Sequence, residues 1–190
     1  MIAQTEIDDR HHAEDVPEGS RWADRANVAF WGLLFGTVVM IAADESLRAR
    51  VAEVAGDNPF SSDAALLTVL RVATFGFALL FALLQAWIYG LLLGAVTATR
   101  RPRLLTGWGY VLVAQAPLVL LVGGAYLLGG TDAVADVQSL AVRLLLGVVS
   151  VAVYAYLAAR RRQVELSRLL AFGVLAAGVN TALLLLSAQR

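Results

Sequence analysis

The 190-residue sequence contains no cysteine, no lysine and only two histidines, His11 and His12. Without cysteine the chain cannot form disulfides, iron–sulfur clusters or cysteine-ligated zinc sites, and it cannot use a thiolate as a nucleophile. Without lysine it cannot form the phosphate-binding loop that ends in Gly-Lys. Both histidines lie in a polar N-terminal stretch, so no apolar segment offers a histidine to haem. We therefore expect no cofactor and no metal site.

Charge is also scarce and balanced. The fifteen basic residues, all arginine, match fifteen acidic residues, so the net charge is zero and nothing favours nucleic acid as a partner. Hydrophobic residues make up 59% of the chain and charged residues 16%. Soluble domains are nearer half apolar and a quarter charged. This balance indicates a membrane protein whose first partner is the lipid bilayer.

The apolar residues are gathered into runs long enough for transmembrane helices, which need about twenty residues each. The expected spans are residues 26–43, 75–99, 104–128, 137–159 and 167–187. Between the first two we expect a polar loop over 44–63, an interfacial or protruding extension over 64–74, and a bend at Gly76. Gly129, Gly130 and Thr131 predict a turn after the third span. The predicted fold is an all-α bundle of five transmembrane helices in the cell membrane.

The N-terminal residues 1–25 are rich in acidic side chains and poor in apolar ones. Such a segment buries too little apolar surface to fold alone, so we expect a disordered acidic tail.

Arginine placement predicts the orientation, because arginine accumulates on the cytoplasmic side of a membrane protein. With the N-terminus inside and the C-terminus outside, ten arginines face the cytoplasm and five lie at the other side. The two dense clusters, which we expect to contact lipid headgroups, are both cytoplasmic: Arg100, Arg101, Arg103, and Arg160, Arg161, Arg162.

Arg71 and Arg143 lie one to two turns inside apolar runs, at their outer ends. A long side chain at such a position can extend to the headgroups, and this is the interpretation we favour. The alternative is a functional charge that faces a cavity.

Three amides lie within predicted spans: Gln85, Gln115 and Asn180. Measured along the helix axis from the nearest cytoplasmic arginine, Gln115 and Asn180 lie about 18 Å deep in the membrane and Gln85 about 22 Å. They are therefore candidates for one polar layer near the middle of the membrane. The layer predicts either hydrogen bonds that hold the helices together or a site for a polar substrate or ion. The first interpretation is favoured because no charged or histidine side chain accompanies the amides.

Two glycine pairs have the spacing that lets helix backbones approach closely: Gly32 with Gly36, and Gly90 with Gly94. The spacing fits packing within the bundle, and equally packing with a second copy of the chain or another membrane protein.

Catalytic constellations are not found in the spans. Intramembrane proteolysis needs paired aspartates or a serine–histidine pair inside the membrane, and the predicted spans contain neither. We therefore expect no enzymatic activity.

Two segments carry a resemblance to a known family. The third span opens with Gly109-Tyr110 and places Pro117 about two turns later; the fourth ends near Tyr156 and is followed by the Arg160–Arg162 turn and by Leu166-Ser167-Arg168. Together with five spans and an acidic N-tail, these segments resemble the YIP family of five-span membrane proteins over roughly residues 64–187. The Asp-Leu-aromatic-Gly-Pro segment of eukaryotic members is not found, so the resemblance is to a prokaryotic-type member.

The resemblance implies a non-enzymatic membrane protein that acts by membrane organisation or partner binding. The alternative is a small transporter or channel subunit that uses the mid-membrane layer of Gln85, Gln115 and Asn180.

Overall fold

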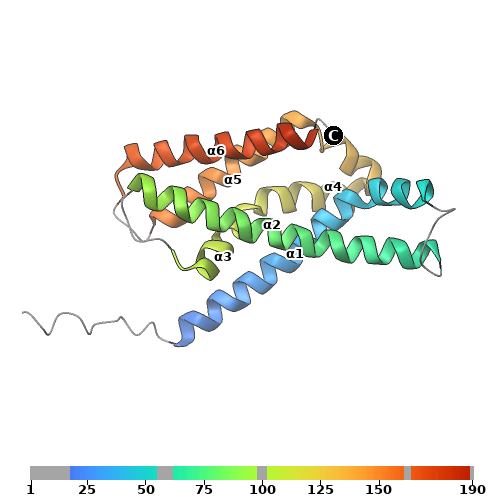
Figure 1. Ribbon diagram of the computed structural model, residues 1–190, viewed down its shortest axis with the longest axis horizontal. Helices are drawn as coiled ribbons and strands as arrows, with labels where there is room; N and C mark the ends of the chain where they lie inside the picture. Colours follow the sequence, from blue (N-terminus) through green and yellow to red (C-terminus); the bar gives the residue numbers. More distant parts are fainter. Residues whose placement is uncertain (1–17, 55–61, 98–101, 161–163, 189–190) are drawn as a thin grey trace, which may run out of the picture.

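The computed structural model describes residues 18–54, 62–97, 102–160 and 164–188, and the side chains of residues 25–54, 62–97, 102–160 and 164–182. The described residues form six α-helices (Figure 1). Their bounds are α1 Glu18–Glu53, α2 Asp63–Thr97, α3 Leu104–Ala114, α4 Ala116–Asp136, α5 Leu140–Ala159 and α6 Leu166–Ala188.

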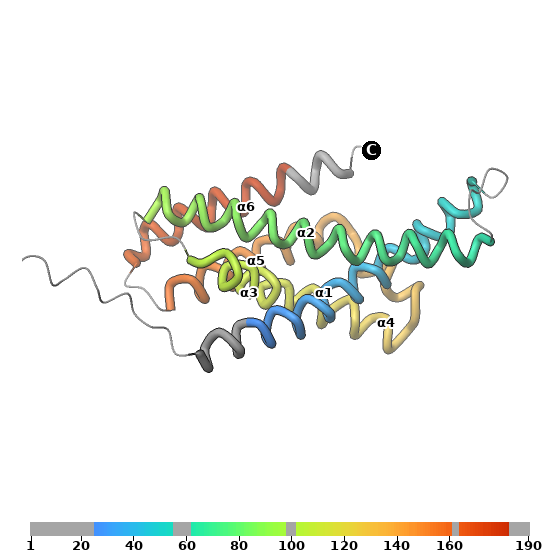
Figure 2. Tube along the Cα trace, turned by 60° about the horizontal axis from the view of Figure 1, so that its bottom comes forward, coloured from blue at the N-terminus to red at the C-terminus, as the bar shows by residue number. Residues whose placement is uncertain are grey.

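The helices form one bundle in which α2 has neighbours on both sides. It packs against α1 and α3 and, on another face, against α6; α3 and α6 in turn contact α5. At 36 and 35 residues, α1 and α2 are each more than 50 Å long by the helical rise of about 1.5 Å. Their connected ends extend beyond the end of α6 and beyond the α4–α5 turn in both views (Figures 1 and 2). We call these ends, residues 44–53 and 63–74, the α1–α2 hairpin end.

Four of the described helical segments are long and apolar enough to cross a membrane: Arg25–Glu53, Asp63–Thr97, Ala116–Asp136 and Leu140–Ala159. Shorter apolar helices cover Leu104–Ala114 and Leu166–Ala182. Much of this apolar surface faces outward, as at Leu127 and Leu128, which are 85% and 91% exposed. Soluble proteins rarely expose apolar surface on this scale. The chain is thus built as a helical membrane bundle.

The core lies where α2, α3, α5 and α6 meet. Its fully buried side chains include Leu93, Leu112, Tyr154 and Phe172, each less than 2% exposed. Small residues of α2, such as Ala82 and Ala86, are buried on the same face as Leu93 and let the neighbouring helices approach.

The expected polar loop over 44–63 is wrong for its first half, because α1 stays helical to Glu53. Pairs one turn apart, Arg48 with Asp44 and Arg50 with Glu53, support the helix here. The buried Val51 adds a packing contact. Of the rest of that loop, Asp63 already begins α2 and residues 55–61 lie outside the described residues.

The start of the second helix and the end of the N-terminal tail also differ from the prediction. Residues 64–74 belong to α2, which stays helical across Gly76 without a break. A tail over 1–25 is too long, since α1 already begins at Glu18. Residues 1–17 lie outside the described part of the chain.

The third predicted span is divided in two at Gln115, between α3 and α4. Pro117 stands at the start of α4, where its missing N–H and its ring oppose a continuous helix. The predicted turn at Gly129–Thr131 is a sharp kink at Gly130, whose φ is +70°, after which helix resumes to Asp136. Ser139 then caps α5, its side chain accepting a hydrogen bond from the Val142 N–H.

Candidate functional site

Two of the three predicted mid-depth amides lie against each other. Gln85 in α2 donates from Nε2 to Asn180 Oδ1 in α6 at 3.2 Å, and also to the Tyr89 hydroxyl at 2.9 Å. Both amides are partly buried, and Tyr89 is 2% exposed. The contact satisfies polar groups that would be costly in a lipid or protein interior. It also joins two helices that are distant in the sequence.

Gln115, the third amide, has a different partner. It lies at the junction of α3 and α4, and its Oε1 accepts a hydrogen bond from Ser150 Oγ of α5 at 3.5 Å. The predicted layer is therefore two separate interhelical contacts. Sequence analysis did not single out Tyr89 or Ser150. Tyr89 could have been found, because it stands four residues after Gln85 and hence on the same helix face.

An aromatic cluster lies next to the Gln85 contact and includes the same Tyr89. The Tyr89 ring meets Tyr154 at a centroid distance of 5.0 Å and Phe172 at 5.9 Å, both edge-to-face. Tyr154 also contacts Phe172 at 5.8 Å and Tyr110 at 6.3 Å. Because the four rings come from α2, α3, α5 and α6, the cluster joins the helices of the core. We refer to these four residues as the aromatic cluster.

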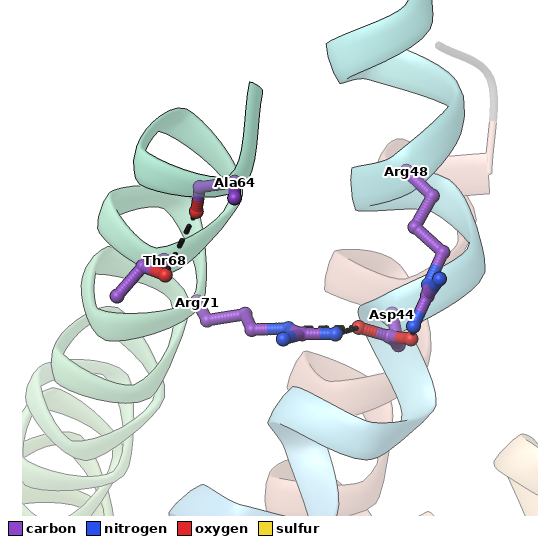
Figure 3. Close-up of polar contacts among 5 residues, drawn as sticks. All are labelled: Asp44, Arg48, Ala64, Thr68 and Arg71. Carbon is purple, nitrogen blue, oxygen red and sulfur yellow. Dashed lines mark hydrogen bonds and ion pairs between the residues drawn. The ribbon is translucent and has the colours of Figure 1, made fainter. Parts of the chain in front are cut away.

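Arg71 has a specific counter-ion at the α1–α2 hairpin end. Its Nε donates to Asp44 Oδ1 at 2.9 Å and its Nη2 contacts the same oxygen, while Arg48 Nε donates to Asp44 Oδ2 at 2.8 Å. Figure 3 shows Asp44 between the two arginines, one from its own helix and one from α2. The Asp44 and Arg71 side chains are only 15% and 33% exposed. Arg71 thus has an acidic protein partner, and its expected headgroup contact stays a prediction.

Arg143 also has a protein partner. Its Nη2 donates to Gln138 Oε1 at 2.6 Å, and Gln138 Nε2 donates to the Ala42 carbonyl at 3.0 Å. This chain of contacts connects the start of α5 to α1.

The two glycine pairs have different surroundings. In α1, Gly32 faces Leu79 and Leu112, and a Cβ on Gly36 would come within 3.0 Å of the Phe75 ring. The first pair therefore lies at the α1–α2 contact. A Cβ on Gly90 of the second pair would meet nothing within 4 Å. Gly94, one turn later, is half-buried.

Of the predicted cytoplasmic clusters, the structure describes Arg103 and Arg160, and both are exposed. Arg100, Arg101, Arg161 and Arg162 lie outside the described residues. Nearby, Arg168 of α6 donates from Nη1 to the Thr97 carbonyl at 3.3 Å and pairs with Glu165 at 3.2 Å. That hydrogen bond ties the start of α6 to the end of α2.

Chemically, the described interior offers amides, hydroxyls and aromatic rings. Within the same residues, no three metal-ligating side chains gather into one group. The arrangement can hold helices together, and the amides of Gln85, Asn180 and Gln115 are used in doing so. Comparisons with protein-family models, curated proteins and solved structures find no match to this chain.

Proposed function

We propose that the chain is a non-enzymatic, five-span protein of the cell membrane that acts by binding a membrane partner or organising lipid. The observation that carries this proposal is the hydrogen bond between Gln85 and Asn180. Their amide groups are engaged with each other and with Tyr89, beside tightly packed rings. A transport site would instead direct such groups at a water-filled path.

The five spans of the proposal are α1, α2, α3 together with α4, α5, and α6. At 11 residues, α3 is about 17 Å long, too short to cross alone, but it continues into α4 after the break at Gln115. The arginine distribution supports a cytoplasmic N-terminus. In this orientation the α1–α2 hairpin end faces outward. The resemblance to prokaryotic-type YIP proteins agrees with this arrangement and remains part of the proposal.

Cysteine labelling tests the packed interior, because the chain has no cysteine of its own. Single cysteines replace Gln85, Gln115 and Asn180, and a small membrane-impermeant maleimide is added to intact cells and to inside-out vesicles. A packed bundle predicts protection of all three positions from both sides. Labelling of any of them in a folded variant would favour the alternative, a transporter or channel subunit with a wet mid-membrane site.

Two exposed positions give the orientation control. Glu53→Cys lies at the α1–α2 hairpin end and Glu165→Cys lies before α6. The proposed orientation predicts that intact cells label only Glu53→Cys and that inside-out vesicles label only Glu165→Cys. The reverse pattern would invert the topology, and labelling of both from one side would contradict the three proposed spans that lie between the two positions.

A further inference from the structure

A polar cavity of about 180 Å³ lies between α1 and the last turns of α4. Its polar lining is Glu45 and Ser46 from α1, Thr131 from α4, and Gln138 from the α4–α5 turn; the remainder is aliphatic and includes Val134. A single water needs only about 10–15 Å³ of such space, so the cavity has room for a small organic group.

One wall of this cavity follows a glycine with a positive φ angle. Gly130 has a φ of +70°, and the kink there sets the direction of residues 131–136, whose Thr131 and Val134 line the cavity. Gly129 is constrained too, because its Cβ would stand 2.7 Å from the Ala133 Cβ. The hydrogen bond from Gln138 to the Ala42 carbonyl fixes the wall against α1.

Opposite charges flank the cavity. Among the described residues the exposed Glu45 carboxylate has neither ion pair nor hydrogen bond, whereas neighbouring Asp44 is engaged by two arginines. Arg143 is not itself a lining residue, but its Nη2 donates to Gln138, which lines the cavity, so its positive charge lies next to the lining. An ammonium group would find acceptors in Glu45, Ser46 and Thr131, while a phosphate would find Arg143.

The surroundings of the cavity favour a lipid as the source of these groups. The apolar run of α1 ends at Ala43, two residues before Glu45, so the cavity lies where α1 leaves the apolar layer. Leu127 and Leu128, almost fully exposed, precede the kink in α4 and offer an apolar surface for acyl chains.

We propose that this cavity binds the headgroup of a phosphatidylethanolamine-type lipid, with the primary ammonium at Glu45 and the phosphate at Arg143. A primary ammonium donates three hydrogen bonds to the acceptors present. The trimethylammonium of phosphatidylcholine donates none, and phosphatidylglycerol has no cation. The inference uses the membrane placement proposed above and adds a ligand class to it.

The test is native mass spectrometry of the detergent-purified full chain with these three phospholipids, matched in acyl chains and concentration. We expect phosphatidylethanolamine to be retained best. Glu45→Gln should lower its affinity about tenfold, as loss of one charge-assisted hydrogen bond does, and leave phosphatidylglycerol unaffected. Arg143→Gln should weaken all three lipids, because each carries the phosphate.

Matched controls come from the exposed pair on the same helix, Glu53→Gln and Arg50→Gln, which lie away from the cavity and should change nothing. Ala135→Leu, which fills the cavity without altering charge, should lower phosphatidylethanolamine retention as well. Equal retention of the three lipids, or a Glu45→Gln variant that keeps its preference, overturns the proposal. Failure of the membrane placement itself would appear separately, in the labelling of Glu53→Cys and Glu165→Cys.

Discussion

Arg71 of α2 and Asp44 of α1 form an ion pair across the hairpin, 27 residues apart in the sequence, with Arg71 Nε 2.9 Å from Asp44 Oδ1. The second carboxylate oxygen accepts from Arg48, so one aspartate serves two guanidinium groups. The pair lies just beyond the apolar run of α1, which ends at Ala43. It therefore connects α1 and α2 at the point where the α1–α2 hairpin end begins.

The first prediction concerns this pair. Asp44→Asn should destabilise the purified protein by about 1–2 kcal/mol, between the values for exposed and fully buried pairs. The reason is that the change leaves the partly buried Arg71 and the exposed Arg48 without their counter-charge. Arg71→Gln should cost less, since Asp44 keeps Arg48. Thermal unfolding in detergent, followed by circular dichroism, measures both effects.

Glu53→Gln is the matched control for the Asp44 change. Its pair with Arg50 has side chains 61% and 77% exposed, and such pairs contribute about 0–1 kcal/mol. If Asp44→Asn and Glu53→Gln lower the free energy of unfolding equally, the Asp44 pair contributes no more to stability than an exposed pair does.

The second prediction concerns Gln85 and Asn180. In a double-mutant cycle with Gln85→Leu and Asn180→Leu, we expect a coupling free energy of about 0.6–1.7 kcal/mol, the range for interhelical hydrogen bonds in membranes. The cycle is measured by reversible unfolding in mixed micelles. Leu84→Ala, a change at a half-exposed neighbour in α2, should not couple to Asn180→Leu. Additive losses in the Gln85–Asn180 cycle would mean that the hydrogen bond contributes nothing to stability.

The third prediction separates the two glycine pairs. Gly36→Leu should destabilise the fold by about 1–3 kcal/mol, because even a Cβ there meets the Phe75 ring. Gly90→Ala should be tolerated, since its Cβ would enter open space. The same unfolding assay compares them. Adding Phe75→Ala should recover part of the Gly36→Leu loss; no recovery would place the clash elsewhere.

Helix type and approximate position could be predicted from the sequence, because apolar runs of membrane length have few other structures available. Boundaries were less certain where polar residues occur inside a helix. Residues 44–53 look like a loop by hydropathy, but neighbouring charges one turn apart stabilise helix there. Local composition does not record such pairs.

Partners across helices were harder to predict than depth. Residue spacing predicts a similar depth for Gln85 and Asn180, which do meet, but Gln115, at a similar depth, pairs with Ser150 instead. Depth along a helix follows from residue spacing, whereas the direction of a side chain around the axis depends on which helices pack together. The same limit applies to Arg71, whose partner is on another helix.

The last prediction concerns the aromatic cluster. Tyr154 is fully buried and its ring contacts Tyr89, Tyr110 and Phe172, so Tyr154→Ala should cost about 3–5 kcal/mol. Tyr156, two residues later in α5, is 62% exposed, and Tyr156→Ala should cost less than about 1 kcal/mol. Both variants remove the same atoms from the same helix, so their difference isolates the cluster from the helix propensity of alanine. Equal unfolding temperatures for the two variants would show that the four rings do not hold α2, α3, α5 and α6 together.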